Sequence, residues 1–129
     1  MTRDVGAQWE DAALAHLTRT GLALLTRNYT CRLGELDLVM RDRDCIVFVE
    51  VRYRGSRTRG DGVVSVGRAK RTKLVRAAQL YLLAHPQLAQ LPCRFDVIGC
   101  SGSLQQPQME WIPSAFEVEH GASCGCASR

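Results

Sequence analysis

The chain has 129 residues, of which 46% are hydrophobic and 23% are charged, and its formal net charge is +4. These values predict one mostly globular domain of ordinary size. No apolar run is long enough for a transmembrane helix, and the N-terminus lacks the pattern of a signal peptide, so we expect a cytoplasmic protein without a membrane partner. The six cysteines form no Cys-x-x-Cys pair, which argues against a structural zinc site.

Helices and strands are predicted in the order helix, three strands, helix, two strands. The first helix covers residues 4–20, where apolar side chains recur at helical spacing between a capping Asp4 and Gly21. Branched and apolar runs indicate strands at residues 22–27, 34–40, 46–53, 94–100 and 109–112, the last ended by Pro113. A second helix is expected at residues 65–85, where Pro86 stops it. This order predicts a mixed α/β sheet with helices packed on it.

The rest of the chain is expected to be loop or tail. Residues 54–62 contain three glycines and three arginines and should form a flexible loop. From Glu119 onward the chain has little to bury, so we expect a single domain at residues 1–118 and a flexible tail at 119–129.

Charged residues occur in the middle of two predicted strands, joined by the polar turn at residues 41–44. Alternation places Glu35 and Asp37 on one face of the first strand, and Glu50 and Arg52 with Phe48 on one face of the second. The opposite faces receive the apolar residues Leu36, Leu38, Val47, Val49 and Val51. A sheet with one apolar face does not need charges there, which suggests a functional site. Glu35 is either a third acid of this site or, as we favour, the partner of an arginine.

Two carboxylates on adjacent strands are suitable ligands for a divalent metal ion. Asp37 and Glu50 could share Mg²⁺ or Mn²⁺, with the carbonyl of Val51 as a further ligand, while Arg52 would stabilise negative charge on a phosphate. In the first helix, Glu10 lies on a stripe of small and apolar residues. It either faces the acidic cluster or reaches solvent at the edge of that stripe.

Positive charge is concentrated between residues 52 and 76, where nine basic residues accompany one acid, Asp61. Such a cluster attracts a polyanion such as nucleic acid. A solvated helix face beside a mobile loop would have the same composition.

The motifs resemble those of one known family. The matching segments are Gly-Glu-Leu-Asp-Leu at 34–38, Val-Phe-Val-Glu-Val-Arg-Tyr-Arg at 47–54, Lys70, Tyr81, Arg-Phe-Asp-Val at 94–97, Gly6, Glu10 and Ala115-Phe116. Over about residues 6–116 the chain resembles the bacterial YraN-like family of unassigned function. The resemblance implies a PD-(D/E)xK nuclease fold, which is a restriction-endonuclease-like mixed sheet flanked by helices. Within that fold it implies a likeness to archaeal Holliday-junction resolvases. These act as dimers, so a homodimer is one expectation.

The resemblance also implies roles for individual residues. Asp37 stands at the motif aspartate, Glu50 at the second acidic ligand, Arg52 at the motif lysine and Glu10 at the helix glutamate. The family usually has Glu-x-Lys where this chain has Glu50-Val51-Arg52. An arginine stays protonated and cannot act as a general base, although it can neutralise a phosphate.

Three functions stay open at this point. The first is a metal-dependent nuclease acting on DNA, with branched or damaged structures among its substrates. The second is a nucleic-acid-binding module that keeps the fold without turnover. The third is a protein-interaction domain in which the acids and arginines form a structural ion-pair network. In the first two, the nucleic-acid backbone would be bound by Arg54, Lys70, Arg71, Lys73 and Arg76.

Overall fold

A computed structural model describes residues 4–53 and 66–116 of the chain. The elements are α1 (Val5–Arg19), β1 (Ala23–Cys31), β2 (Gly34–Asp42), β3 (Cys45–Tyr53), α2 (Arg68–Ala84), α3 (Pro86–Ala89), β4 (Cys93–Gly102) and β5 (Pro107–Phe116). Their order is the predicted one, with the short helix α3 added after α2. No helix in these two ranges is long and apolar enough to cross a membrane.

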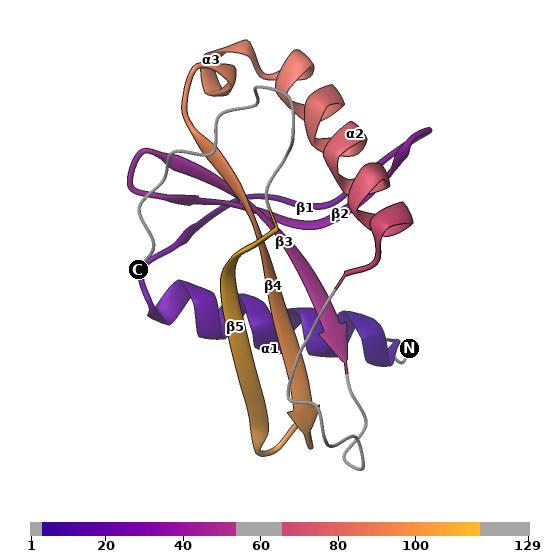
Figure 1. Ribbon diagram of the computed structural model, residues 1–129. Coiled ribbons are helices and arrows are strands. Elements are labelled where there is room, and N and C mark those ends of the chain that lie inside the picture. The colour runs from indigo at the N-terminus through magenta and orange to yellow at the C-terminus, as the bar shows by residue number, and fades with distance from the viewer. Residues whose placement is uncertain (1–3, 54–65, 117–129) are drawn as a thin grey trace.

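The five strands form one sheet in the order β1-β2-β3-β4-β5. β3 and β4 pair in parallel, and the other neighbours pair antiparallel. A parallel pair needs a long crossover, and α2 lies in the one between β3 and β4. Figure 1 shows α1 crossing the sheet well away from α2. The architecture is therefore α/β, a mixed open sheet flanked by helices, which confirms the predicted restriction-endonuclease-like class.

Both faces of the sheet are apolar, so the prediction of a single apolar face is wrong. One core lies under α1 and the other under α2, and each helix needs an apolar sheet surface to cover its own stripe. The α1 core contains Trp9, Ala13, Leu17, Leu38, Met40, Val47, Val49 and Ile98. The α2 core contains Leu36, Val39, Ile46, Phe48, Leu74, Ala77, Ala78, Tyr81, Phe95 and Val97. Each face of the sheet is therefore covered by a helix with its own core.

The helix ends show which predicted boundaries were correct. Asp4 caps α1, because its Oδ1 accepts a hydrogen bond from the Gly6 N–H at 3.0 Å. After α1 the chain turns at Gly21, whose φ of 110° favours glycine. The second helix begins at Arg68 with Gly67 as its N-cap, three residues later than the predicted start at residue 65.

All five strands are longer than the sequence predicted, and the C-terminal extensions are longest in β1 and β5. β1 runs on to Cys31, and β5 continues through Pro113 to Phe116. β5 is an edge strand, where the missing N–H of a proline is tolerated on the side without a partner. The predicted loop at 54–62, Arg54 and the predicted tail at 119–129 lie outside the described residues.

A buried ion-pair network connects β2, β4 and β5. The side chain of Arg94 is almost fully buried, and its Nη2 lies 3.1 Å from Asp42 Oδ2. Its Nε donates to Asp96 Oδ1 at 3.0 Å. The carboxylate of Asp96 also accepts hydrogen bonds from Trp111 Nε1 and from the Ser114 N–H, each at 2.9 Å. This network ties together segments that are far apart in the chain.

Candidate active site

β2 and β3 separate next to Asp37. Their ladder runs from the pair Asp42–Cys45 to the pair Leu38–Val49. One residue further along β2, Asp37 Oδ2 accepts a hydrogen bond from the Val51 N–H at 2.9 Å. A carboxylate therefore occupies a place in the ladder that a backbone carbonyl would normally take.

The backbone is irregular at the same place. Asn28 of β1 has a φ of 57°, and it falls between the pairs Arg27–Leu38 and Tyr29–Leu36. Leu36 packs in the α2 core and Leu38 in the α1 core. The prediction that Leu36 and Leu38 share a face is wrong, because the strict alternation of a strand is interrupted at Asp37.

Asp37 and Glu50 form a pair of adjacent carboxyl groups. Glu50 is buried and Asp37 is half-buried. Burial, together with the negative charge of Glu50 and a hydrogen bond between the two side chains, raises the pKa of Asp37 to about 6 from its ordinary 3.8. The Val51 N–H and the positive charge of Lys70 act in the opposite direction. The site therefore favours the protonated form of Asp37 more than water does.

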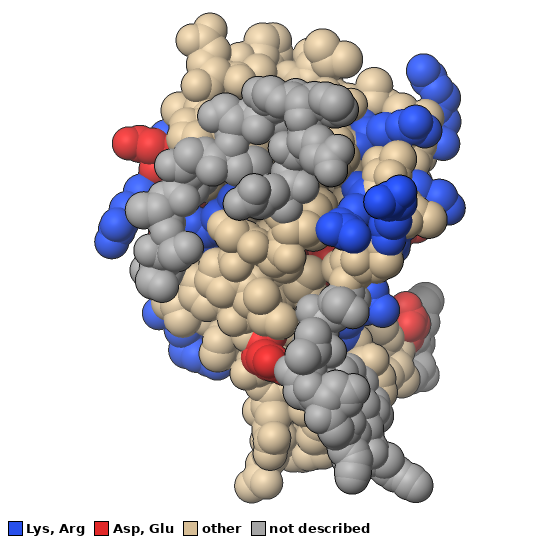
Figure 2. Space-filling model, viewed as in Figure 1, with Lys and Arg blue, Asp and Glu red and all other residues tan. Residues whose placement is uncertain are grey.

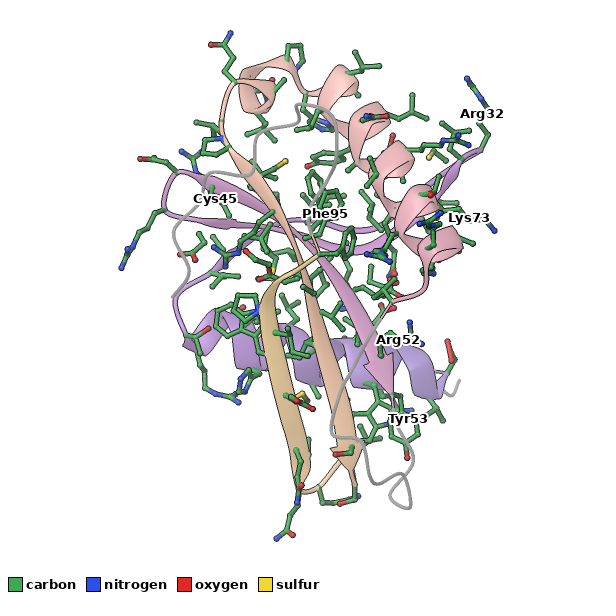
Figure 3. All side chains as sticks on the ribbon, viewed as in Figure 1. Arg32, Cys45, Arg52, Tyr53, Lys73 and Phe95 are labelled. Carbon is green, nitrogen blue, oxygen red and sulfur yellow. The ribbon has the colours of Figure 1, made fainter. Side chains whose placement is uncertain are left out.

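Lys70 and Arg52 occupy different positions relative to this pair. Lys70 Nζ, from the first turns of α2, lies 3.5 Å from Glu50 Oε2. Arg52 follows Glu50 by two residues on β3 and is half-buried, and Figure 3 shows it close to the C-terminal end of that strand. Within residues 4–53 and 66–116, no ion pair joins Arg52 to either carboxylate. Among the predicted backbone-binding residues that the structure describes, Lys70 is the one that forms an ion pair with this acidic pair.

Glu10 lies beside the acidic pair but is held by an arginine. Its Oε1 is 3.5 Å from Arg27 Nη2, and its side chain also bonds to Asn28. Burial and the charge of Asp37 raise the pKa of Glu10, and the charge of Arg27 lowers it. Arg27 binds Asp11 as well, at 2.7 Å.

Arg27 and Asn28 are neighbours of the site that were not predicted from the sequence. The sequence signal for Arg27 is a single cation in a short apolar strand, which does not indicate what the cation contacts. The left-handed backbone of Asn28 had no signal beyond asparagine's tolerance for that conformation.

The donor set for a metal ion is small. Considering the described residues alone, no group of three or more His, Cys, Asp or Glu side chains lies close enough together to hold one. The candidate ligands are thus the pair Asp37 and Glu50, with Glu10 set apart by Arg27. Glu35 is exposed, and none of the arginines within the described ranges forms an ion pair with it.

The basic residues of α2 gather on one surface. We name the exposed side chains Arg32, Arg68, Arg71, Lys73 and Arg76 the basic surface. Figure 2 shows Lys and Arg gathered on the α2 side of the molecule, and Figure 3 shows Lys73 on α2 on the same side as Arg32. The turn of Arg32 touches α2, because a Cβ added at Gly34 would lie 3.2 Å from the Lys73 carbonyl oxygen. Arg32 was not predicted, and Arg71 also lies over the ring of Phe116, 5.8 Å from its centroid.

Comparison with known proteins places this chain in a family. A family model described as "Uncharacterised protein family UPF0102" matches residues 9–100. A "UPF0102 protein" of Stutzerimonas stutzeri is 51% identical over 112 residues, covering 87% of this chain and 93% of the relative. One of Xanthomonas campestris pv. campestris is 54% identical over 114 residues, covering 88% and 92%. One of Pseudomonas aeruginosa is 48% identical over 119 residues, covering 91% and 95%.

Proposed function

Since the chain belongs to the uncharacterised protein family UPF0102, as the resemblance to YraN-like proteins indicated, we propose a function from its site: metal-dependent hydrolysis of phosphodiester bonds in DNA. The observation that carries the proposal is the pair Asp37 and Glu50. Two carboxyl groups face each other beside a single lysine, at a break in the sheet and next to the basic surface. Two acids in contact repel each other, and a bound cation would relieve that repulsion.

The residues at the site fit a divalent metal ion. Magnesium and manganese prefer oxygen ligands and are often held by one or two carboxylates, with water and phosphate in the remaining positions. Asp37 and Glu50 would be the two ligands. Burial and the negative charge of Glu50 raise the pKa of Asp37, and such a cation would neutralise that charge. A bound divalent cation would supply Lewis-acid activation of the phosphate and of a water molecule.

The other residues would bind and orient the substrate. Arg32, Lys73 and Arg76 offer exposed positive charge to successive phosphates of the backbone. Arg52 cannot take a proton from water, so its contribution is to neutralise charge on the phosphate. In the reaction, a water oxygen forms a new bond to phosphorus and the ester bond to the sugar oxygen breaks. The proton lost by the water passes to solvent, and the leaving sugar oxygen takes one from solvent.

The test is cleavage of labelled DNA by the wild type and by Asp37→Asn. We expect the wild type to cut single-stranded or branched DNA in Mg²⁺ or Mn²⁺ but not in EDTA, and Asp37→Asn to show no cleavage above background. Asp44→Asn is the matched control, because Asp44 is an exposed aspartate of the same hairpin with a side chain 89% exposed. Equal cleavage by the wild type and Asp37→Asn would identify a contaminating nuclease and reject the proposal.

One observation favours a second function, a nucleic-acid-binding module without turnover. The position of the motif lysine is occupied by Arg52, which stays charged. In that case the protein binds DNA with strong salt dependence in the presence or absence of metal and cuts no substrate shape. The molar mass of the protein, measured by light scattering, would test the proposed homodimer.

A further inference from the structure

Lys70 differs from the other basic residues of α2 in where it points. It precedes Leu74, Ala77 and Tyr81 by four, seven and eleven residues, so it continues the buried stripe of the helix toward the sheet. Lys73 and Arg76 lie off this stripe and are exposed. Lys70 is also exposed, but its place on the stripe brings its ammonium group to the acidic pair.

The contact of Lys70 is with a proposed metal ligand. Its Nζ lies 3.5 Å from Glu50 Oε2, while the side chain remains 44% exposed and that of Glu50 is 9% exposed. An ammonium group has three hydrogens to donate, so a contact with Glu50 leaves others directed toward solvent. A phosphate that approached the acids would meet these donors. Arg52 has no such contact within the part of the chain that the structure describes.

We propose that Lys70 supplies the cation of the catalytic site, binding a non-bridging oxygen of the scissile phosphate while it positions Glu50. This inference rests on the proposed nuclease function and changes one part of it. Lys70 would act at the scissile phosphate and not at the flanking backbone. The site would then contain a lysine although position 52 is an arginine. Preorganised cations that face developing charge are among the strongest contributors to catalysis.

Two lysine variants of the same helix separate this role from backbone binding. Lys70→Met keeps most of the length of the side chain without its charge, and Lys73→Met makes the same change on the basic surface. At saturating DNA we expect kcat of Lys70→Met to fall about 100-fold, with KM within about threefold of the wild type. Lys73→Met should instead raise KM and lower the salt slope of binding by about one. Lys70→Arg, which restores the charge, should recover part of kcat.

Metal affinity gives a readout that does not depend on turnover. Calorimetry with Mn²⁺ alone should show Lys70→Met binding about three- to tenfold more tightly than the wild type, because a positive charge beside Glu50 is removed. Lys73→Met should bind Mn²⁺ as the wild type does. Equal Mn²⁺ affinity in the two variants, or a higher KM with normal kcat in Lys70→Met, would overturn the inference. A wild type that cleaves nothing would reject the nuclease function, while the titration would still decide whether Lys70 belongs to the metal site.

Discussion

Replacing Arg94 by leucine is expected to lower the free energy of unfolding by about 3–5 kcal/mol, the usual cost of removing one partner from a buried ion pair. Arg94 is 1% exposed, and its guanidinium faces Asp42 at 3.1 Å and Asp96 at 3.0 Å. The variant keeps the buried carboxylate of Asp96 and removes the cation beside it. Asp96 retains hydrogen bonds from Trp111 and Ser114, which lessens the loss without supplying a charge. Denaturant unfolding followed by circular dichroism measures the difference.

Arg41→Leu is the matched control for Arg94→Leu. Arg41 belongs to the same sheet and pairs with Asp44 at 3.6 Å, but both side chains are exposed. Exposed pairs contribute about 0–1 kcal/mol, so Arg41→Leu should be close to neutral. If the two variants differed by less than about 1 kcal/mol, well below the 3–5 kcal/mol typical of a broken buried pair, the network at Arg94 would not be the stabilising contact described above.

Asp37→Asn is expected to stabilise the metal-free protein at pH 8 and much less at pH 4.5. Because the pKa of Asp37 in the folded protein is raised to about 6 from 3.8, the folded state binds a proton more tightly than the unfolded chain does. The stability linked to that proton is complete below pH 3.8 and is lost as the pH rises through about 6. Asparagine cannot ionise, so its advantage should be greater at pH 8 than at pH 4.5 by roughly 2 kcal/mol.

Thermal unfolding in EDTA at the two pH values measures this effect. Asp44→Asn controls for the change in net charge on an exposed side chain. Addition of Mn²⁺ at pH 8 should reverse the order, stabilising the wild type but not Asp37→Asn, since a ligand stabilises only the state that binds it. An Asp37→Asn variant that is no more stable than the wild type at pH 8 would contradict a strained carboxyl pair. Functional sites often contain residues that lower the stability of the folded protein, as this carboxyl pair would.

Much of the fold could be predicted because its signals are local. Trp9, Ala13 and Leu17 repeat at helical spacing, and Phe48, Val49 and Val51 have the branched and aromatic character of a strand. The order of the elements followed from these patterns. The second apolar face did not, since a short apolar run has the same sequence whether one or both of its faces are buried. The extension of β5 past Pro113 depends on its place at the edge of the sheet, which a single sequence does not show.

The site was predictable in part for the same reason. Asp37 and Glu50 stand out as acids within apolar strands, and their pairing follows from one short hairpin. The pairing of Glu10 with Arg27 was missed because it depends on how α1 crosses β1, a tertiary contact with no local pattern. The position of Lys70 on the buried stripe is visible in the helical spacing, but its contact with Glu50 depends on how α2 packs on the sheet. Arg32 joins them through the contact of a turn with α2, which no periodicity indicates.

The hydrogen bond from Val51 to Asp37 has a consequence for the choice of side chain at this position. One carboxylate oxygen, Oδ2, is committed to the backbone of β3, so the reach of the other oxygen is set by a single methylene group. A glutamate has the same charge but one more methylene group. Either its hydrogen bond with the Val51 N–H would be lost, or its second oxygen would lie in a different place. The distance between the two strands therefore suits the side-chain length of aspartate and not that of glutamate. Asp37→Glu should therefore lose Mn²⁺ affinity in calorimetry although its charge is unchanged, and wild-type affinity would show that the gap adapts to the longer side chain.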